Sequence, residues 1–131
     1  MKKILITGGA GYLGSQIALN ILKKNYKVIV LDSFINSSKS IFLNFNKVIE
    51  KKILKNNFEI IEGDIRDQKL LFDIFQKNFV KGEKISTVIH CAGLKSVNSS
   101  IIKPYDYWQV NVSGTINLVK IMKSFSCKKI I

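Results

Sequence analysis

The sequence predicts an α/β fold built on a doubly wound parallel sheet. Short apolar runs alternate with longer segments of helical periodicity along all 131 residues. The apolar runs are continuous rather than alternating with polar residues, which is typical of parallel strands covered on both faces. The pattern contains no internal repeat and no linker, so one domain is expected.

Strands are predicted where an apolar run stops at glycine or at a polar residue. The first run ends at Gly8-Gly9, the second at Asp32 and the fourth at Ala92-Gly93. The last run reaches the end of the sequence and is expected to begin a fifth strand. The predicted strands are 3–7, 28–31, 58–61, 87–91 and 128–131.

Helices are predicted between these strands from apolar residues spaced three or four apart. In the first helix this spacing places Leu13, Ile17 and Ile21 on one face. Pro104 suits the first turn of the last and longest helix, which should bury Gly114 and Leu118. The predicted helical segments are 12–25, 41–53, 70–75 and 104–126.

Composition excludes several classes of protein. A hydrophobic content of 47% indicates a globular chain. The net charge of +12 comes from scattered lysines with one arginine, whereas nucleic-acid binding needs clustered basic residues. No apolar run approaches the roughly 18 residues of a membrane span. Cys91 and Cys127 lie far apart without metal-ligand spacing, so we expect no metal site and a cytoplasmic location.

The strongest motif is the glycine-rich turn between the first strand and the first helix, where Gly8, Gly11 and Gly14 have the spacing GxxGxxG. Glycine lets the chain reverse tightly and lets the backbone approach a pyrophosphate. The free amides and the dipole of the helix N-terminus then favour the phosphates. In this strand–turn–helix context the motif predicts a Rossmann-type dinucleotide-binding sheet.

Asp32 is the second part of the motif. It ends the second strand, 18 residues beyond Gly14, where an acid receives hydrogen bonds from the adenosine ribose. A carboxylate there also repels a 2′-phosphate, so NAD is the expected cofactor. The alternative is an aspartate that only stabilises a turn or caps a helix.

Further candidates follow the third and fourth strands. Asp64 can receive the adenine amino group, or it can cap the helix that begins near Asp67, and both interpretations stay open. The small residues Ala92 and Gly93, with Cys91, let the backbone approach the middle of the cofactor, and Lys95 follows within reach of the nicotinamide ribose. His90 is interpreted as a packed strand residue and Arg66 as an ion-pairing one. Asn111, polar within the last helix, needs a partner, for which the nicotinamide side is a candidate.

The glycine turn, Asp32 and the residues after the third and fourth strands, together with their neighbours in sequence, resemble the UDP-glucose 4-epimerases of the extended short-chain dehydrogenase/reductase family. The resemblance covers essentially the whole chain and about the first two-fifths of such an enzyme. Cys91 stands where an aromatic residue is common, and Asn98-Ser99 replaces the usual Gly-Glu. The stretches that carry the resemblance are 7–15, 31–37, 62–67, 88–97, 103–107 and 111–115.

The resemblance implies further contacts with NAD. Tyr12 and Leu13 would lie against the pyrophosphate. Ser33, Asn36 and Ser37 would surround the adenosine with Asp32, and Ile65 would contact adenine beside Asp64. The resemblance also implies a UDP-sugar substrate, and a homodimer formed through the long helix.

The implied reaction interconverts UDP-glucose and UDP-galactose through a 4-keto intermediate. It needs a tyrosine base in a Tyr-x-x-x-Lys pair, in which the lysine lowers the pKa of the phenol. None of the four tyrosines, Tyr12, Tyr26, Tyr105 and Tyr107, has lysine four residues later. We therefore expect residues 1–131 to be the N-terminal part of an NAD-binding domain, without catalytic residues, without the substrate domain and inactive alone.

Two alternatives remain. Within the family, the chain could belong to a UDP-N-acetylglucosamine 4-epimerase or a nucleotide-sugar dehydratase, which the substrate domain would distinguish. Outside enzymes, it could be a nucleotide-binding module that works without catalysis. Saturable binding of NADH by the isolated chain would favour such a module.

Overall fold

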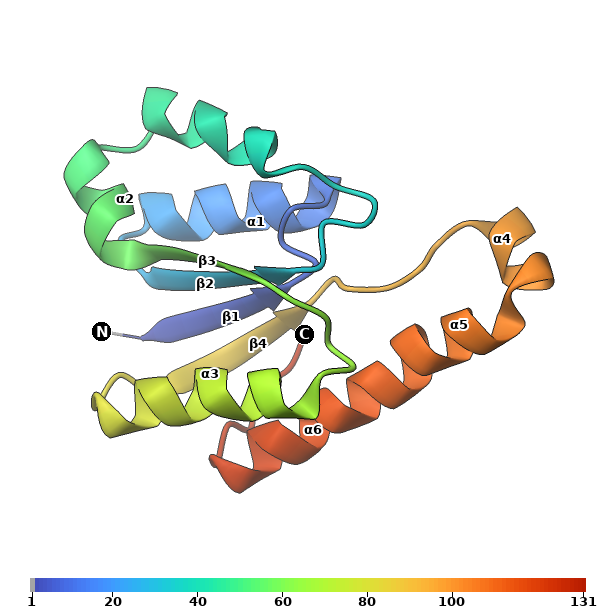
Figure 1. Cartoon of the computed structure of the whole chain (residues 1–131). Helices are drawn as coiled ribbons and strands as arrows, with labels where there is room; N and C mark the ends of the chain where they lie inside the picture. Colours follow the sequence, from blue (N-terminus) through green and yellow to red (C-terminus); the bar gives the residue numbers. More distant parts are fainter. Residues whose placement is uncertain (1) are drawn as a thin grey trace.

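The computed structural model describes residues 2–131 and contains a four-stranded parallel sheet (Figure 1). The strands lie in the order β3-β2-β1-β4, and Ile60, Val30, Ile6 and Ile89 form one row across them. The predicted α/β class and parallel sheet are confirmed. The strands are β1 (Lys3–Thr7), β2 (Lys27–Asp32), β3 (Phe58–Glu62) and β4 (Ile85–His90).

Helices cover both faces of the sheet, as Figure 1 shows. Helices α1, η1 and α2 lie on one face, and α3 and α6 lie on the other. No helix among residues 2–131 is long and apolar enough to cross a membrane. The helices are α1 (Tyr12–Lys23), η1 (Lys39–Lys47), α2 (Lys51–Asn57), α3 (Gln68–Val80), α4 (Val97–Ile102), α5 (Pro104–Trp108), η2 (Gln109–Gly114) and α6 (Thr115–Ser124).

Each face of the sheet has its own apolar core, because successive strand residues point to opposite faces. Leu5, Ile29 and Val88 pack under α3 and α6 with Phe75 and Leu118. Ile6, Val28 and Val30 pack under α1 and η1 with Leu22, Phe42 and Phe45. This double coverage explains why the central strands β1 and β2 are apolar between their end residues.

Two predicted helices differ in detail from the structure. The face of α1 that packs most deeply runs through Gly14, Ala18 and Leu22, one position beyond the predicted face, and Leu13 is 58% exposed. The small residues bring this helix close to the sheet. The predicted helix over 41–53 is instead a 3₁₀ helix followed by the short α2, and Phe42 and Phe45 of the 3₁₀ helix are both buried.

The long helix predicted over 104–126 is present as α5, η2 and α6 in direct succession, and η2 is a π-helix. Gly114 and Leu118 are buried as predicted, and so is Met122 one turn further on. The fifth strand is reduced to one parallel bridge between Ile130 and Val88. Lys129 and Ile131 still exchange backbone hydrogen bonds with β4, so the segment lies where a fifth strand would begin.

Charged residues gather at the amino ends of the strands. The buried Lys3 ammonium donates to Asn78 Oδ1 at 2.5 Å and to Glu83 Oε2 at 2.7 Å, and Lys27 pairs with the other oxygen of Glu83. Hydrogen bonds from Lys27 and Lys3 lower the pKa of Glu83 to about 2. This ion-pair cluster (Lys3, Lys27, Asn78 and Glu83) ties β1 and β2 to α3 and the turn after it.

The opposite edge of the sheet contains the point where the strand order reverses. From β1 the chain winds outward through β2 to β3 and then returns to place β4 on the other side of β1. The loops that leave the carboxyl ends of β1 and β4 therefore diverge from each other. In open α/β sheets this divergence forms the crevice in which ligands bind.

Candidate functional site

The glycine turn after β1 depends on positions that admit no side chain. Gly8 has φ +67°, and its amide donates to Leu31 O at 2.8 Å. A Cβ at Gly8 would lie 2.5 Å from the backbone nitrogen of Ala92, and one at Gly14 would lie 2.4 Å from Gly8 O. The turn is therefore pressed between α1 and the loop after β4, as the predicted close packing requires.

Helix α1 begins at the same turn with free donors. Its N-cap, Gly11, has no side chain that could accept from the first amides of the helix. Those amides also lack partners inside the helix, because an α-helix leaves its first N–H groups unsatisfied. Together with the helix dipole they form a site that favours an anion.

Asp32 is joined to the glycine turn by a hydrogen bond. Its Oδ2 accepts from the Ala10 amide at 2.8 Å, while Oδ1 accepts from the Phe34 amide and from the Ser37 hydroxyl. The residue is only 8% exposed, yet it lines the cavity described below. The acid and the turn thus form one unit, although they are 18 or more residues apart in the sequence.

The loop after β2 is bent sharply by Phe34, which adopts φ +56°. Left-handed backbone is unfavourable for a residue with a Cβ, so its neighbours must hold it there. The Asp32 carboxylate accepts a hydrogen bond from the Phe34 amide, and the Phe34 ring packs against the core under α1. This bend brings Ile35, Asn36 and Ser37 to the cavity wall.

The structure excludes the interpretation of Asp64 as a helix cap. The N-cap of α3 is Asp67, whose side chain accepts from the Leu70 amide, so Asp64 does not cap this helix. Both oxygens of Asp64 instead receive hydrogen bonds from the Arg66 side chain. These bonds lower the pKa of Asp64, and they confirm Arg66 as an ion-pairing residue. Asp64 still lines the cavity beside Ile65.

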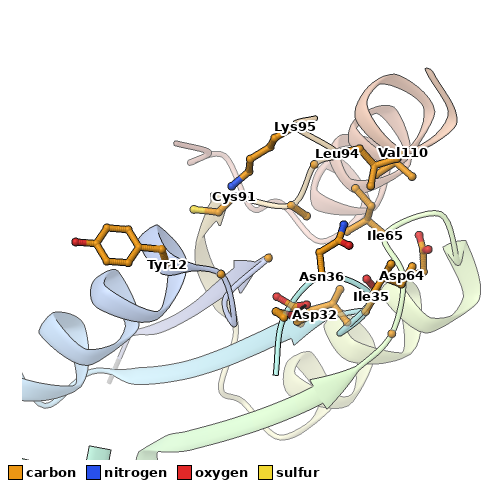
Figure 2. A pocket seen from close by; sticks show the side chains of 18 of the residues that line it. Tyr12, Asp32, Ile35, Asn36, Asp64, Ile65, Cys91, Leu94, Lys95 and Val110 are labelled. Atoms are coloured by element: carbon orange, nitrogen blue, oxygen red, sulfur yellow. Dashed lines mark hydrogen bonds between the residues drawn. The ribbon is translucent and has the colours of Figure 1, made fainter. Parts of the chain in front are cut away.

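The loop after β4 closes the other side of the site. Cys91 and Lys95 both line the cavity, and Figure 2 shows the Lys95 side chain extended toward Cys91. Burial raises the pKa of the Cys91 thiol, and the nearby Lys95 charge opposes this only partly. Asn111 holds the loop from the helix, since Leu94 N donates to Oδ1 at 2.8 Å and Nδ2 donates to Leu94 O at 3.0 Å.

These elements enclose a cavity of about 350 Å³ at the carboxyl edge of the sheet (Figure 2). Most of the predicted site residues line it: Gly8, Gly11, Tyr12, Asp32, Ser33, Asn36, Ser37, Asp64, Ile65, Cys91, Ala92, Gly93 and Lys95.

Three predicted site residues do not line the cavity. Gly14 lies behind the turn, the side chain of Leu13 is largely exposed, and the side chain of Asn111 is bonded to Leu94. Leu94, within the predicted loop 91–95, also lines the cavity. Five further lining residues were not predicted from the sequence, because their apolar or small side chains carry no chemical signal. They are Leu31, Ile35, Gly63, Ser96 and Val110.

Comparison with known proteins agrees with this geometry. The model of the family described as GDP-mannose 4,6 dehydratase matches residues 5–131. The chain belongs to this family. It is 40% identical to the UDP-glucose 4-epimerase of Mus musculus over 134 aligned residues, and 44% identical to that of Yersinia enterocolitica over 128. These alignments cover 100% and 98% of the chain, so the resemblance to UDP-glucose 4-epimerases is confirmed.

A solved structure extends the match to the fold. The UDP-glucose 4-epimerase of Bifidobacterium longum, in complex with NAD+ and UDP, superposes with a TM-score of 0.85 at 34% identity over 98% of this chain. The chain spans only a little over a third of these proteins: 37% of the mouse enzyme, 35% of the Yersinia enzyme and 36% of the Bifidobacterium chain.

Proposed function

We propose that this chain forms the NAD-holding part of a nucleotide-sugar epimerase that interconverts UDP-glucose and UDP-galactose. The observation that carries the proposal is the hydrogen bond between Asp32 and the Ala10 amide, which joins the acid to the glycine turn. The names of the relatives supply the substrate class, and the complex with NAD+ and UDP supports the cofactor.

The proposed roles follow from the lining of the cavity. The diphosphate rests on the first amides of α1 at Tyr12 and Leu13, where the backbone is open to an anion. The adenosine ribose donates to Asp32, beside Ser33, Asn36 and Ser37, and adenine lies near Asp64 and Ile65. The loop from Cys91 to Lys95 faces the nicotinamide ribose. Bound NAD would supply a reversible hydride acceptor.

The chemical step needs groups that we place elsewhere in the complete enzyme. None of the tyrosines of this chain has lysine four residues later. We therefore assign residues 1–131 to cofactor binding and not to proton transfer, and we expect no epimerisation by this chain alone. The free thiols Cys91 and Cys127 support a cytoplasmic location.

Titration of the purified chain with NADH, followed by fluorescence, tests the cofactor site. We expect saturable binding that D32N weakens about tenfold or more, since hydrogen bonds to a charged group contribute ~1.5–3 kcal/mol. The matched control is D73N, which removes the same charge from an exposed position on α3. Thermal unfolding of both variants separates lost affinity from lost folding. Equal affinities of D32N and D73N would refute the assignment of Asp32.

We also propose a homodimer formed through α4 and the long helix. Five large apolar residues there are 62–77% exposed, and α4 and α5 extend beyond the sheet (Figure 1): Val97, Ile101, Ile102, Tyr105 and Trp108. Apolar residues gathered on one protrusion favour burial against another chain. Sedimentation should detect dimers that I101E dissociates, whereas V80E, on an equally exposed residue of α3, should leave them intact. A wild-type monomer at high concentration would refute the dimer.

A further inference from the structure

The only histidine of the chain joins three parts of the site through both ring nitrogens. His90, at the end of β4, has Nδ1 2.6 Å from Thr7 Oγ1 and Nε2 2.9 Å from Thr115 Oγ1. Thr7 is fully buried at the end of β1, immediately before Gly8, and Thr115 begins α6. The imidazole therefore bridges the central strand and the long helix.

The neighbouring hydrogen bonds decide which ring nitrogen carries the proton. The Thr115 hydroxyl donates to Asn111 O at 2.7 Å, so its oxygen is left to accept from His90 Nε2–H. Nδ1 must then accept from the Thr7 hydroxyl, because a neutral imidazole has one donor and one acceptor. Thr7 Oγ1 in turn accepts from the Ala92 amide at 3.4 Å. Only the Nε2–H form satisfies every group in this chain.

Both ends of this chain of hydrogen bonds reach the candidate cofactor site. At one end, Ala92 is the residue against which Gly8 packs with no room for a Cβ. At the other end, Asn111 holds both backbone groups of Leu94, immediately before Lys95. Threonine-to-backbone bonds thus connect the histidine to the glycine turn and to the loop that closes the cavity.

We propose that His90, as the neutral Nε2–H tautomer, is a positioning residue that sets the spacing between the glycine turn, the loop 91–95 and the long helix for a bound dinucleotide. The proposal rests on the proposed function for its ligand. The arrangement of protons is a property of the free chain and is independent of that ligand. Burial lowers the pKa of His90, which agrees with a neutral ring at neutral pH.

The tautomer can be measured directly, because one histidine gives one set of ring ¹⁵N resonances. We expect a protonated Nε2 and an unprotonated Nδ1 at neutral pH in the free chain. A protonated Nδ1, or a ring that exchanges freely between tautomers, would overturn the proposed direction of the hydrogen bonds.

A matched pair of variants tests positioning. T115V removes the hydroxyl at nearly constant shape, and T115S retains it. We expect T115V to shift the amide resonances of Ala92 and Leu94 and to weaken NADH binding about three- to tenfold, the range expected for one lost hydrogen bond. T115S should restore both. S86A is the control, because it removes a different hydrogen bond of β4, to Lys3 O at the far end of the strand.

The outcomes separate the two proposals. Unshifted Ala92 and Leu94 amides in T115V would refute positioning, whether or not NADH binds. Positioning would also be refuted if S86A weakened NADH binding as much as T115V does, since a general loss of stability would then explain both results. Absence of NADH binding by the wild type would refute the proposed function, while the tautomer and the amide shifts would still decide how His90 acts on the loop.

Discussion

The two ends of the sheet offer cavities of nearly equal size but of opposite character. The cavity at the carboxyl edge measures about 350 Å³, and the one at the amino edge about 370 Å³. Four lysines and two glutamates line the amino-edge cavity, whereas the residues that line the carboxyl edge include four glycines and two aspartates. Volume alone would not distinguish a ligand site from a structural one.

The difference lies in which groups are already paired. At the amino edge Glu83 satisfies Lys3 and Lys27, so the main charges there stabilise the fold. At the carboxyl edge Asp32 is also paired within the chain, but the first amides of α1 have no side-chain cap. A ligand gains most where the protein has left donors open, and this favours the carboxyl edge as the functional one.

The largest expected effect on NADH binding comes from replacing Gly8 with alanine, for which Gly82 offers a matched control. Gly8 and Gly82 have almost the same backbone, with φ +67° and +72°, but only Gly8 has atoms in the space of a Cβ. G82A should cost about 1 kcal/mol, the cost of left-handed backbone for a residue with a side chain. G8A should abolish NADH binding, because Ala92 must move. Fluorescence titration and thermal unfolding measure both, and G8A with wild-type affinity would contradict the proposed turn.

Removing Glu83 should affect stability without affecting the cofactor site. E83Q leaves the buried Lys3 ammonium without its carboxylate, a change that typically costs ~3–5 kcal/mol for a fully buried pair. Because Glu83 itself is about one-third exposed, we expect roughly 2 kcal/mol. Urea unfolding measures the loss. Changed NADH affinity of the folded fraction would show that the two ends are coupled.

Acid should lower the stability of the chain in two separate pH ranges. The pKa of His90 is depressed from 6.5 by burial, so the unfolded chain binds the proton first and stability falls as the pH drops below 6.5. The pKa of Glu83 is lowered from 4.5 to about 2, so its contribution is present above 4.5 and is lost between these values. Thermal melts of H90Q should lack the first decline. E83Q should reduce the second, to which Asp64 also contributes.

The smallest effect is expected at an exposed ion pair away from both ends. Lys69 and Asp73 lie one helical turn apart on α3, 3.1 Å from each other and largely in solvent. D73N should change the free energy of unfolding by about 0.3 kcal/mol, as measured for such pairs. A loss comparable to that of E83Q would mean that surface charge, and not the buried amino-edge cluster, dominates stability.

The fold and most of the cavity wall could be predicted because their signals are local. Continuous apolar runs identified the strands, and the glycine spacing after β1 identified the turn. Acids and small residues directly after a strand were also predictable, since parallel strands bring their carboxyl ends to one edge. Asp32, Asp64 and Cys91 all lie there.

What could not be predicted depends on helix geometry and on contacts distant in sequence. Asn111 was expected beside the nicotinamide, but its amide bonds to Leu94, and the neighbouring Val110 faces the cavity. No periodicity distinguishes these two orientations, because the helix is not regular at this point. The sequence also left open whether Asp64 caps α3, and only the backbone shows that Asp67 is the cap.

The π-helical turn at Gln109–Gly114 separates α5 from α6 within one continuous helical segment. A widened turn accommodates one more residue than an α-helical turn, and each residue rotates an α-helix by about 100°. Mutations before Gln109 can therefore alter the apolar surface of α4 and α5 while Leu118 and Met122 stay packed in the core. Conversely, a one-residue deletion within this turn would restore α-helical spacing and rotate the residues before it, including those of α5, by about 100° relative to α6.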